Sequence, residues 1–213
     1  EPQFLNLLDI EEKDVFSYLN YSVPNINNDN FIYENYSPHK KNNRQYLTND
    51  NALKIDSFRQ IINSWLDDKK INENEYFYLL SSIISSVPFV SNIAGTYGAY
   101  LKNWDKRSFK VVTLEKPHIF NNQKKNLVFN QDSNLLIDNI EGDILYLDPP
   151  YNSRQYMPNY HLLETIARYD YPSLKGVTGI RQSTKDTKSK YCQKSHAEDS
   201  LSELISKSRF KYI

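Results

Sequence analysis

The stretch GDILYLDPPYNSRQY, residues 142–156, constrains the fold more than any other part of this 213-residue sequence. Residues 144–147 form a short apolar run, which is typical of a strand buried on both faces of a parallel sheet. Asp148 then stands at the carboxyl end of that strand, where ligands collect in open α/β sheets. The two prolines that follow restrict their own backbone and that of the residue before each of them. The sequence therefore predicts a rigid corner that holds Asp148 and Tyr151 in a fixed relation.

Helical and strand-like patterns alternate around this corner. Apolar residues recur at helical spacing over 55–66, 76–87, 159–169 and 197–208, which predicts four helices. Strand-like pieces are FKVVTLE (109–115), NLVFNQ (126–131) and the apolar run before Asp148. The last two flank a short helical segment, and this order predicts a parallel pair of strands joined by a crossover. Together the patterns predict an α/β fold with a helical insertion.

The same patterns divide the chain into two regions. Residues 1–108 are interpreted as a helical region that forms the insertion, and residues 109–213 as part of an α/β catalytic core. The chain begins at Glu1 rather than at a methionine, and it ends in FKYI, which has the pattern of the start of an apolar strand. We therefore expect the chain to be part of a longer polypeptide.

Composition narrows the function classes. The 26 basic and 26 acidic side chains balance, so a nucleic-acid partner would have to be met by a local patch. Cys192 is the single cysteine, which excludes a disulfide framework and a multi-cysteine zinc site and suits a reducing cytoplasm. No run approaches the roughly 18 apolar residues that a membrane-spanning helix needs. We expect a cytoplasmic protein without a membrane partner and without a metal site.

The predicted corner suits chemistry on an exocyclic amine of an aromatic base, such as N6 of adenine. The lone pair of such a nitrogen is delocalised into the ring, so the nitrogen is a poor nucleophile. Two acceptors for its N–H groups would draw it toward tetrahedral geometry, and the carboxylate of Asp148 and the carbonyl of Pro149 supply both. A ring stacked on the base contributes roughly 1–3 kcal/mol. Tyr151 is placed for that role.

At these residues the sequence resembles a known family. The motif DPPY at the end of a buried strand resembles the catalytic motif of adenine-N6 DNA methyltransferases that use S-adenosylmethionine. The longer run DPPYNSRQYMPNYHLLETIARYDYP, with EYFYLLSSIISSVPFVSNIAGTYGAYLKNW upstream, is similar to the FokI-type and Dam-like modification methylases. The resemblance extends from about Phe31 to the C-terminus. It implies a Rossmann-like core that binds S-adenosylmethionine.

The resemblance also implies roles for single residues. The catalytic loop would be Asp148, Pro149, Pro150 and Tyr151, acting on an adenine flipped out of double-stranded DNA. Asp148 would also face the cofactor, and Asp132 matches the family acid that approaches its adenosyl group. The implied reaction is an in-line displacement at the methyl group that needs no metal, so positioning and hydrogen bonding supply the catalysis. His161 is interpreted as a structural histidine, because transfer to an amine needs no strong base before the methyl moves.

One feature of the family is missing from this sequence. Its members have a glycine-rich F-x-G-x-G loop after the first strand, which cradles the methionine end of the cofactor. The segment NIAGTYGAY offers Gly95 and Gly98, but it follows a helical stripe and Pro88 rather than a strand. We therefore expect part of the cofactor site to lie outside this chain.

Three places are candidates for contact with DNA. Segment 88–108 interleaves aromatic with basic residues, among them Tyr97 and Lys102, which suits a groove that faces phosphates. The alternative is a tight turn with packed aromatic and solvated basic side chains. Arg154, directly after the catalytic loop, would line the target pocket or pair with a neighbouring acid. The third place is a basic loop at 172–195, interpreted as a phosphate-binding lid rather than a solvated loop; its candidate contacts are Lys185, Lys188 and Lys190.

The leading hypothesis is a DNA adenine-N6 methyltransferase of a restriction–modification system, with a cognate restriction endonuclease as a possible partner at the same DNA site. An RNA or protein-amide methyltransferase is the nearest rival among enzymes, although related enzymes of that kind carry Asn in place of Asp148. From another class, the chain would be a DNA-binding remnant or specificity module that kept the fold and lost turnover. A further alternative is that DPPY forms a structural turn without a catalytic role, since Asp and Pro are ordinary turn residues.

Overall fold

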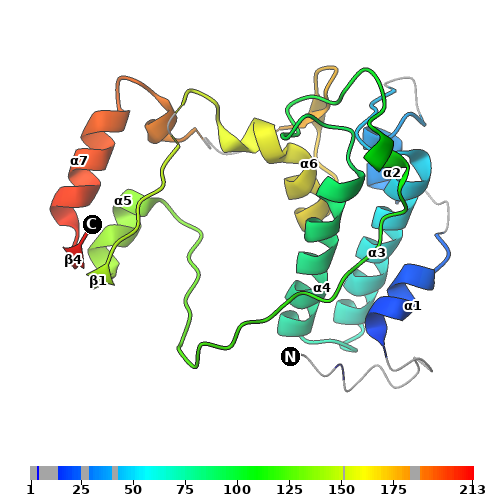
Figure 1. Ribbon diagram of the computed structural model, residues 1–213, viewed down its shortest axis with the longest axis horizontal. Coiled ribbons are helices and arrows are strands. Elements are labelled where there is room, and N and C mark those ends of the chain that lie inside the picture. The colour runs from blue at the N-terminus through cyan, green and yellow to red at the C-terminus, as the bar shows by residue number, and fades with distance from the viewer. Residues whose placement is uncertain (1–3, 5–13, 25–28, 40–42, 151, 183–187) are drawn as a thin grey trace. The chain divides into compact units, whose positions relative to one another are not determined.

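The computed structural model describes residues 4, 14–24, 29–39, 43–150, 152–182 and 188–213. The chain forms two compact units (Figure 1). Unit 1 lies within Glu1–Phe120 and Pro158–Gln182, and unit 2 within Asn121–Met157 and Ser183–Ile213. Because α6 begins at Tyr156 and ends at Arg168, its first residues belong to unit 2 and the rest to unit 1.

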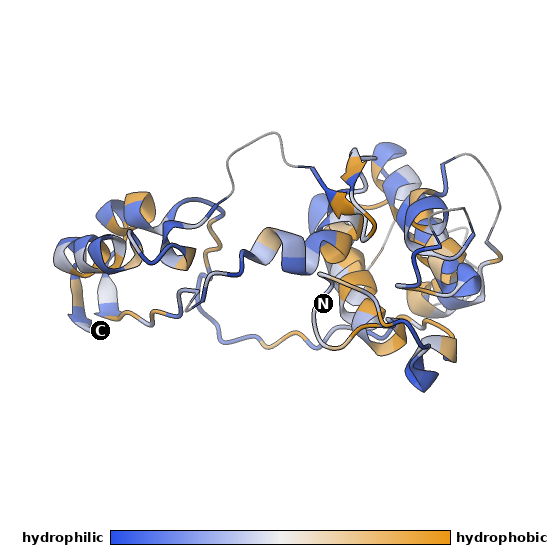
Figure 2. Ribbon diagram, turned by 90° about the horizontal axis from the view of Figure 1, so that it is seen from above, coloured by the Kyte–Doolittle hydropathy of each residue, from blue (hydrophilic) through white to orange (hydrophobic). Residues whose placement is uncertain are grey.

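Unit 1 is mainly helical. Its elements are α1 (Val15–Tyr21), α2 (Phe31–Tyr36), α3 (Asn49–Asp67), α4 (Glu73–Ser86), the 3-10 turns Val87–Val90 and Lys106–Phe109, most of α6, and the antiparallel hairpin of β2 (Leu174–Lys175) and β3 (Ile180–Arg181). The helices predicted at 55–66, 76–87 and 159–169 are confirmed as α3, α4 and α6. In Figure 2 these helices carry both hydrophobic and hydrophilic segments, as expected for elements with one buried face.

Local sequence explains where the long helices begin. The Thr48 hydroxyl accepts the N–H of Asn51, so Thr48 is the N-cap of α3. At the start of α4, Asn72 and Glu75 each accept the backbone N–H of the other, which forms a capping box. Helix α4 ends at Ser86 and gives way to the 3-10 turn Val87–Val90, because Pro88 cannot continue the hydrogen-bond ladder of the helix.

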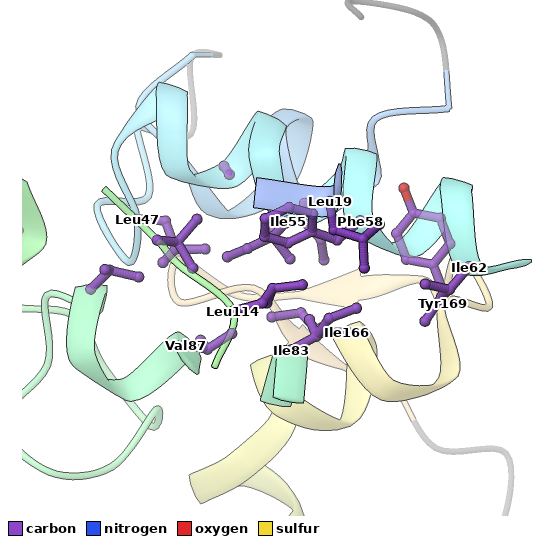
Figure 3. Close-up of a cluster of buried hydrophobic side chains, with 14 of the residues drawn as sticks. Leu19, Leu47, Ile55, Phe58, Ile62, Ile83, Val87, Leu114, Ile166 and Tyr169 are labelled. Carbon is purple, nitrogen blue, oxygen red and sulfur yellow. The ribbon is translucent and has the colours of Figure 1, made fainter. Parts of the chain in front are cut away.

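The core of unit 1 lies between these helices. Figure 3 shows side chains from different elements pointing toward one another: Leu19 of α1, Ile55 and Phe58 of α3, Ile83 of α4 and Ile166 of α6. All five are fully buried. Burial of such a side chain contributes about 1.5–3 kcal/mol, so this cluster is the main source of stability for unit 1.

Segment 109–115, predicted as a strand, forms none: Phe109 ends a 3-10 turn, and residues 110–115 have no sheet partner among the described residues. Buried and exposed side chains do alternate along this segment, since Val112 and Leu114 are buried and their neighbours are exposed. Side-chain amides take the place of a neighbouring strand. Asn51 donates to the carbonyls of Ser108 and Lys110 and accepts the N–H of Val112, while Asn20 exchanges two hydrogen bonds with the backbone of Leu114.

Unit 2 contains α5 (Ser133–Leu136), β1 (Gly142–Ile144), α7 (Ala197–Lys207) and β4 (Phe210–Tyr212), with 3-10 turns at Ile137–Asn139 and Lys190–Cys192. Strand β1 pairs in parallel with β4, in the register Gly142 to Phe210 and Ile144 to Tyr212. The predicted short helix, the helix at 197–208 and the strand in FKYI are confirmed.

Two predictions about this sheet are wrong. Residues 126–131 form no strand, and the parallel partner of β1 is β4 rather than that segment. The run 144–147 is not buried, since Ile144 and Tyr146 are 73% and 83% exposed. Two strands of three residues each are too few to cover their own faces. The described residues thus combine helices with two small two-stranded sheets, and the Rossmann-like core stays a prediction.

The division into units differs from the predicted regions. Unit 1 continues past residue 108, because Val112 and Leu114 are part of its core. It also takes in residues 158–182, where Leu162 and Ile166 join the same core. The predicted basic loop at 172–195 is therefore divided: the β2–β3 hairpin belongs to unit 1, and residues from Ser183 onward belong to unit 2.

Candidate functional site

The predicted catalytic corner, residues 148–151, follows β1 in unit 2. Four residues without helix or strand separate the end of β1 from Pro149. Asp148 is exposed, and its carboxylate makes no hydrogen bond or ion pair with any described residue. Pro149 and Pro150 are half-buried, and Tyr151 lies outside the described residues. An acid that serves as a turn cap would accept a nearby backbone N–H. Asp148 accepts none in the described part of the chain.

The residues after the corner are held to the 3-10 turn Lys190–Cys192. Gln155 makes a two-way contact with the backbone of Ser189: its amide oxygen accepts the N–H at 2.8 Å, and its nitrogen donates to the carbonyl at 3.4 Å. The Cys192 thiol donates to the carbonyl of Arg154 at 3.3 Å. These contacts bring exposed Arg154 close in the fold to exposed Lys190, two of the residues predicted to contact DNA.

The same turn also contacts the start of α5. The Tyr191 hydroxyl donates to the side-chain oxygen of Asn134 at 2.6 Å, and the nitrogen of Asn134 donates to the carbonyl of Ser200. Asp132 caps α5 by accepting the N–H of Asn134 at 2.9 Å. The turn Lys190–Cys192 thus joins the segment after the catalytic corner to the helix that Asp132 caps.

Asp132 has a local structural role that sequence reasoning did not identify. One of its carboxylate oxygens caps α5, and the side chain is exposed. The second oxygen has no partner among the described residues, so Asp132 can still accept a hydrogen bond from a bound group. Its expected approach to an adenosyl group stays a prediction.

Segment 88–108 belongs to unit 1 and is fixed by a buried asparagine. The Asn92 amide donates to the carbonyls of Gln45 and Leu101, both at 2.9 Å, and accepts the N–H of Asp105 at 2.8 Å. The segment from 91 to 105 has neither helix nor strand, but these three bonds close it into a defined loop. Its exposed basic residue Lys102 is therefore presented from a fixed backbone.

The structure removes Tyr97 from the predicted DNA contacts. Its side chain is 2% exposed, and burial raises the pKa of its hydroxyl to about 12. The carbonyl of Tyr97 accepts two hydrogen bonds, from the Tyr46 hydroxyl at 3.0 Å and from Nε2 of His161 at 2.8 Å. Tyr97 is therefore one of the packed aromatic residues of the alternative interpretation. Its hydrogen-bond partners are distant in sequence, so the local pattern could not reveal this packing.

His161 is a structural histidine, as predicted. It is fully buried, and burial lowers its pKa to about 4, so the imidazole is neutral at pH 7. Because the Tyr97 carbonyl can only accept, Nε2 of His161 carries the proton. This bond fastens loop 91–105 to α6, the helix that begins five residues after the catalytic corner.

Two arginines in the candidate DNA-binding segments have structural partners. Arg107 donates to the carbonyls of Ser91 and Ile93. Arg181, part of the predicted basic loop, is buried and makes two hydrogen bonds to Asp170, at 2.7 and 3.1 Å. Lys188 and Lys190 are exposed, whereas Lys185 lies outside the described residues.

No predicted site residue lines the cavity of about 440 Å³ between α4 and segment 110–115. In the described part of the chain, no helix is long and apolar enough to cross a bilayer. Histidine, cysteine and acidic side chains in that part form no group of three or more that could hold a metal ion.

Comparison with known proteins gives a consistent result. Residues 7–213 match the family described as D12 class N6 adenine-specific DNA methyltransferase. The chain is 47% identical to Type II methyltransferase M.FokI of Planomicrobium okeanokoites over 212 residues, which are 100% of this chain and 33% of that protein. It is 44% identical over 205 residues to modification methylase StsI of Streptococcus sanguinis, covering 96% of this chain and 31% of that protein.

A shorter relative is Type II methyltransferase M.NlaIII of Neisseria lactamica, 43% identical over 183 residues, which are 85% of this chain and 54% of that protein. The chain thus spans about a third of the length of the first two relatives and about half of the third. No solved structure matches it.

Proposed function

Because the chain belongs to the D12 class of N6 adenine-specific DNA methyltransferases, we propose that it supplies the catalytic corner of an enzyme that methylates N6 of adenine in DNA. The observation that carries this proposal is the Asp148 carboxylate. It is exposed, has no partner among the described residues, and is followed at once by two prolines that stiffen the backbone.

In this proposal two acceptors of the corner act on the adenine amine. The carboxylate of Asp148 and the carbonyl of Pro149 accept its N–H groups and localise the nitrogen lone pair. The ring of Tyr151 stacks on the base after the base leaves the duplex. Catalysis then depends on pre-positioned acceptors, which cost no reorganisation during the reaction.

The methyl donor in this proposal is S-adenosylmethionine, which supplies an electrophilic methyl group. Asp132 would hold its adenosyl group through the carboxylate oxygen that does not cap α5. The negative charge of Asp148 would favour the positive sulfonium nearby. The rest of the cofactor site would come from polypeptide outside these residues, because the chain has no F-x-G-x-G loop.

The proposed nucleic-acid partner is double-stranded DNA. Arg154 and Lys190 are exposed and linked through the contacts of Gln155 and Cys192, so they form one basic site beside the corner in unit 2. Lys188 lies two residues from Lys190 in the same segment. Lys102 of unit 1 and Lys185 remain proposed phosphate contacts. Phosphate contacts of this kind position a duplex without reading its sequence.

The proposed biological role is modification within a restriction–modification system. The relatives carry the names Type II methyltransferase and modification methylase. A restriction endonuclease that acts on the same DNA site is the proposed partner. The competing function, a DNA-binding module without turnover, is favoured only by the missing glycine-rich loop.

A methyl-transfer assay separates the two functions. The chain, joined to polypeptide that completes the cofactor site, is incubated with radiolabelled S-adenosylmethionine and duplexes that contain or lack adenine, and the modified base is identified by mass spectrometry. We expect label on N6 of adenine only. Asp148→Ala should abolish transfer, whereas Asp143→Ala, an exposed acid of β1 in the same unit, should not. DNA binding without transfer, together with no calorimetric binding of S-adenosylmethionine, would leave only the binding module.

A further inference from the structure

The turn between β2 and β3, residues 176–179, is held in one conformation by buried side chains. The guanidinium of Arg44, which is 6% exposed, donates to the carbonyls of Val177 at 2.9 Å and Gly176 at 3.1 Å. The buried Tyr36 hydroxyl donates to the carbonyl of Gly179 at 3.0 Å. The N–H of Gly179 also bonds to the carbonyl of Gly176, which closes the turn.

Glycine is required at both ends of this turn. Gly176 and Gly179 have φ values of +73° and +68°, a region that other residues rarely adopt. A Cβ on Gly179 would also lie 2.7 Å from Nε of Arg44. The sequence KGVTGI therefore specifies a rigid turn packed on a guanidinium, rather than part of a mobile lid.

The direction of the carbonyls determines where the N–H groups point. In a planar trans peptide the N–H points opposite to the C=O of the same unit, and the described residues contain no cis peptide. The carbonyls of Gly176 and Val177 both point at Arg44. The N–H groups of Val177 and Thr178 consequently point away from it, and they bond to no described residue. Val177 is 77% exposed and Thr178 is half-buried, so a ligand can reach the turn from the side of Val177.

The charge around the turn is positive. Arg44 makes no ion pair with a carboxylate of the described residues, although it is buried, so its charge is not neutralised there. Exposed Lys175 directly precedes the turn and has no acidic partner in the described part. The neighbouring Arg181 is neutralised by Asp170. Successive backbone N–H groups in a turn bind anions, and a nearby positive charge strengthens this binding.

We propose that the turn 176–179 binds a phosphate of the DNA backbone through the N–H groups of Val177 and Thr178, with Lys175 as a second contact. This inference rests on the proposed function, because it takes duplex DNA as the ligand. The rigid backbone makes such a contact favourable, since little conformational freedom is lost on binding. Arg44 acts as a positioning residue that fixes the turn and adds positive potential beneath it.

A proline substitution tests the backbone contact directly. Val177→Pro removes one proposed N–H donor, and Val177→Ala is the matched control, because it also loses the valine side chain but keeps the N–H. Binding of a fluorescein-labelled 20-base-pair duplex is followed by anisotropy. We expect Val177→Pro to weaken binding about tenfold relative to Val177→Ala, as for loss of one charge-assisted hydrogen bond. Lys175→Gln should lower the slope of log K against log salt by about 0.9, and Lys175→Arg should restore it.

Backbone NMR provides a second readout that needs no variant to fold. The wild-type protein is titrated with the same duplex. The amide signals of Val177 and Thr178 should change their chemical shifts in proportion to the amount of complex formed. Equal affinity of Val177→Pro and Val177→Ala, or silent amides at 177 and 178 while the protein binds DNA, would overturn this inference and leave the proposed function intact. Failure of the wild-type protein to bind any duplex would overturn both.

Discussion

Raising the pH from 4 to 8 should destabilise unit 1 through one buried carboxyl group, that of Asp56 on α3. Its oxygens accept the N–H groups of Ile32 and Tyr33 at the start of α2, at 3.0 and 2.8 Å. They also accept the hydroxyl of Tyr169, just after α6, at 2.7 Å. Burial raises the pKa of Asp56 from its ordinary 3.8 to about 7, against the opposite effect of these three donors.

The sign follows from the proton count of the two states. Between pH 4 and pH 7, Asp56 is protonated in the folded protein and ionised in the unfolded chain, so the folded state binds more protons. Stability therefore falls as the pH rises through this window and is constant outside it. A difference of about three pKa units corresponds to a loss on the order of 4 kcal/mol. When Asp56 is protonated, its hydroxyl can donate to the Tyr169 oxygen. The Tyr169 hydroxyl then donates to the carbonyl of Asp29, which is 3.1 Å away.

The variant Asp56→Asn isolates this contribution. It cannot ionise, so the part of the pH dependence that comes from Asp56 should disappear. An amide also places an NH2 group against the N–H of either Ile32 or Tyr33, which should cost about 1–3 kcal/mol at pH 4. Urea unfolding followed by tryptophan fluorescence reports on unit 1 alone, because Trp65 and Trp104 both lie in it. Asp50→Asn, an exposed acid at the start of the same helix, is the matched control.

The decisive quantity is the difference in unfolding free energy between wild type and Asp56→Asn at each pH. We expect this difference to change by about 4 kcal/mol between pH 4 and pH 8, so that the wild type is the more stable protein at pH 4 and Asp56→Asn the more stable at pH 8. The control should follow the wild type at every pH. A difference that stays constant across this range would refute the assignment of the titration to Asp56.

Further expected outcomes concern single contacts. Asn51→Leu should lower the unfolding free energy of unit 1 by about 3 kcal/mol in the same urea assay, because three hydrogen bonds to the segment around residue 110 are lost; a loss below about 1 kcal/mol would contradict this. Changing Lys185, Lys188 and Lys190 together to Gln should reduce the salt slope of DNA binding by up to about 2.7, and an unchanged slope would show that these side chains are only solvated. Tyr191→Phe should speed hydrogen exchange at the start of α5, and unchanged exchange would rule out the Tyr191 contact as its anchor.

The long helices of unit 1 could be predicted from the sequence, because the features that specify a helix lie within the helix itself. The apolar spacing over 55–66 acts within one or two turns and appears in α3 as predicted, and the Thr48 cap of that helix is an equally local signal. Pairing of strands is different, because it joins distant segments. Nothing local distinguishes residues 126–131 from residues 210–212 as the partner of β1, and the structure selects the latter.

Candidate site residues show the same limit. An aromatic residue among lysines suggested a DNA contact at Tyr97, but the fold buries this side chain, and its backbone carbonyl accepts a hydrogen bond from His161, 64 positions away. Arg181 lies in the predicted basic loop, but its charge is paired with Asp170, which the sequence pattern does not reveal. No sequence motif predicts the roles of Cys192 and Arg44. Both donate hydrogen bonds to backbone carbonyls that are distant in sequence and close only in the folded chain. Asp148 was predicted because proline, acid and aromatic residues stand next to one another in sequence.

The most direct measurement of the central claim uses a chimera. The chain aligns along its whole length with a third of Type II methyltransferase M.FokI, so these 213 residues can replace the matching segment of that protein. Radiolabelled methyl transfer from S-adenosylmethionine to a duplex is then measured for the chimera and for its Asp148→Ala and Asp143→Ala variants. We predict label on adenine N6 for the chimera and the Asp143 variant, and a loss of at least about 100-fold for Asp148→Ala. Near-equal transfer by the Asp148 variant, or no transfer by the chimera, would contradict the account.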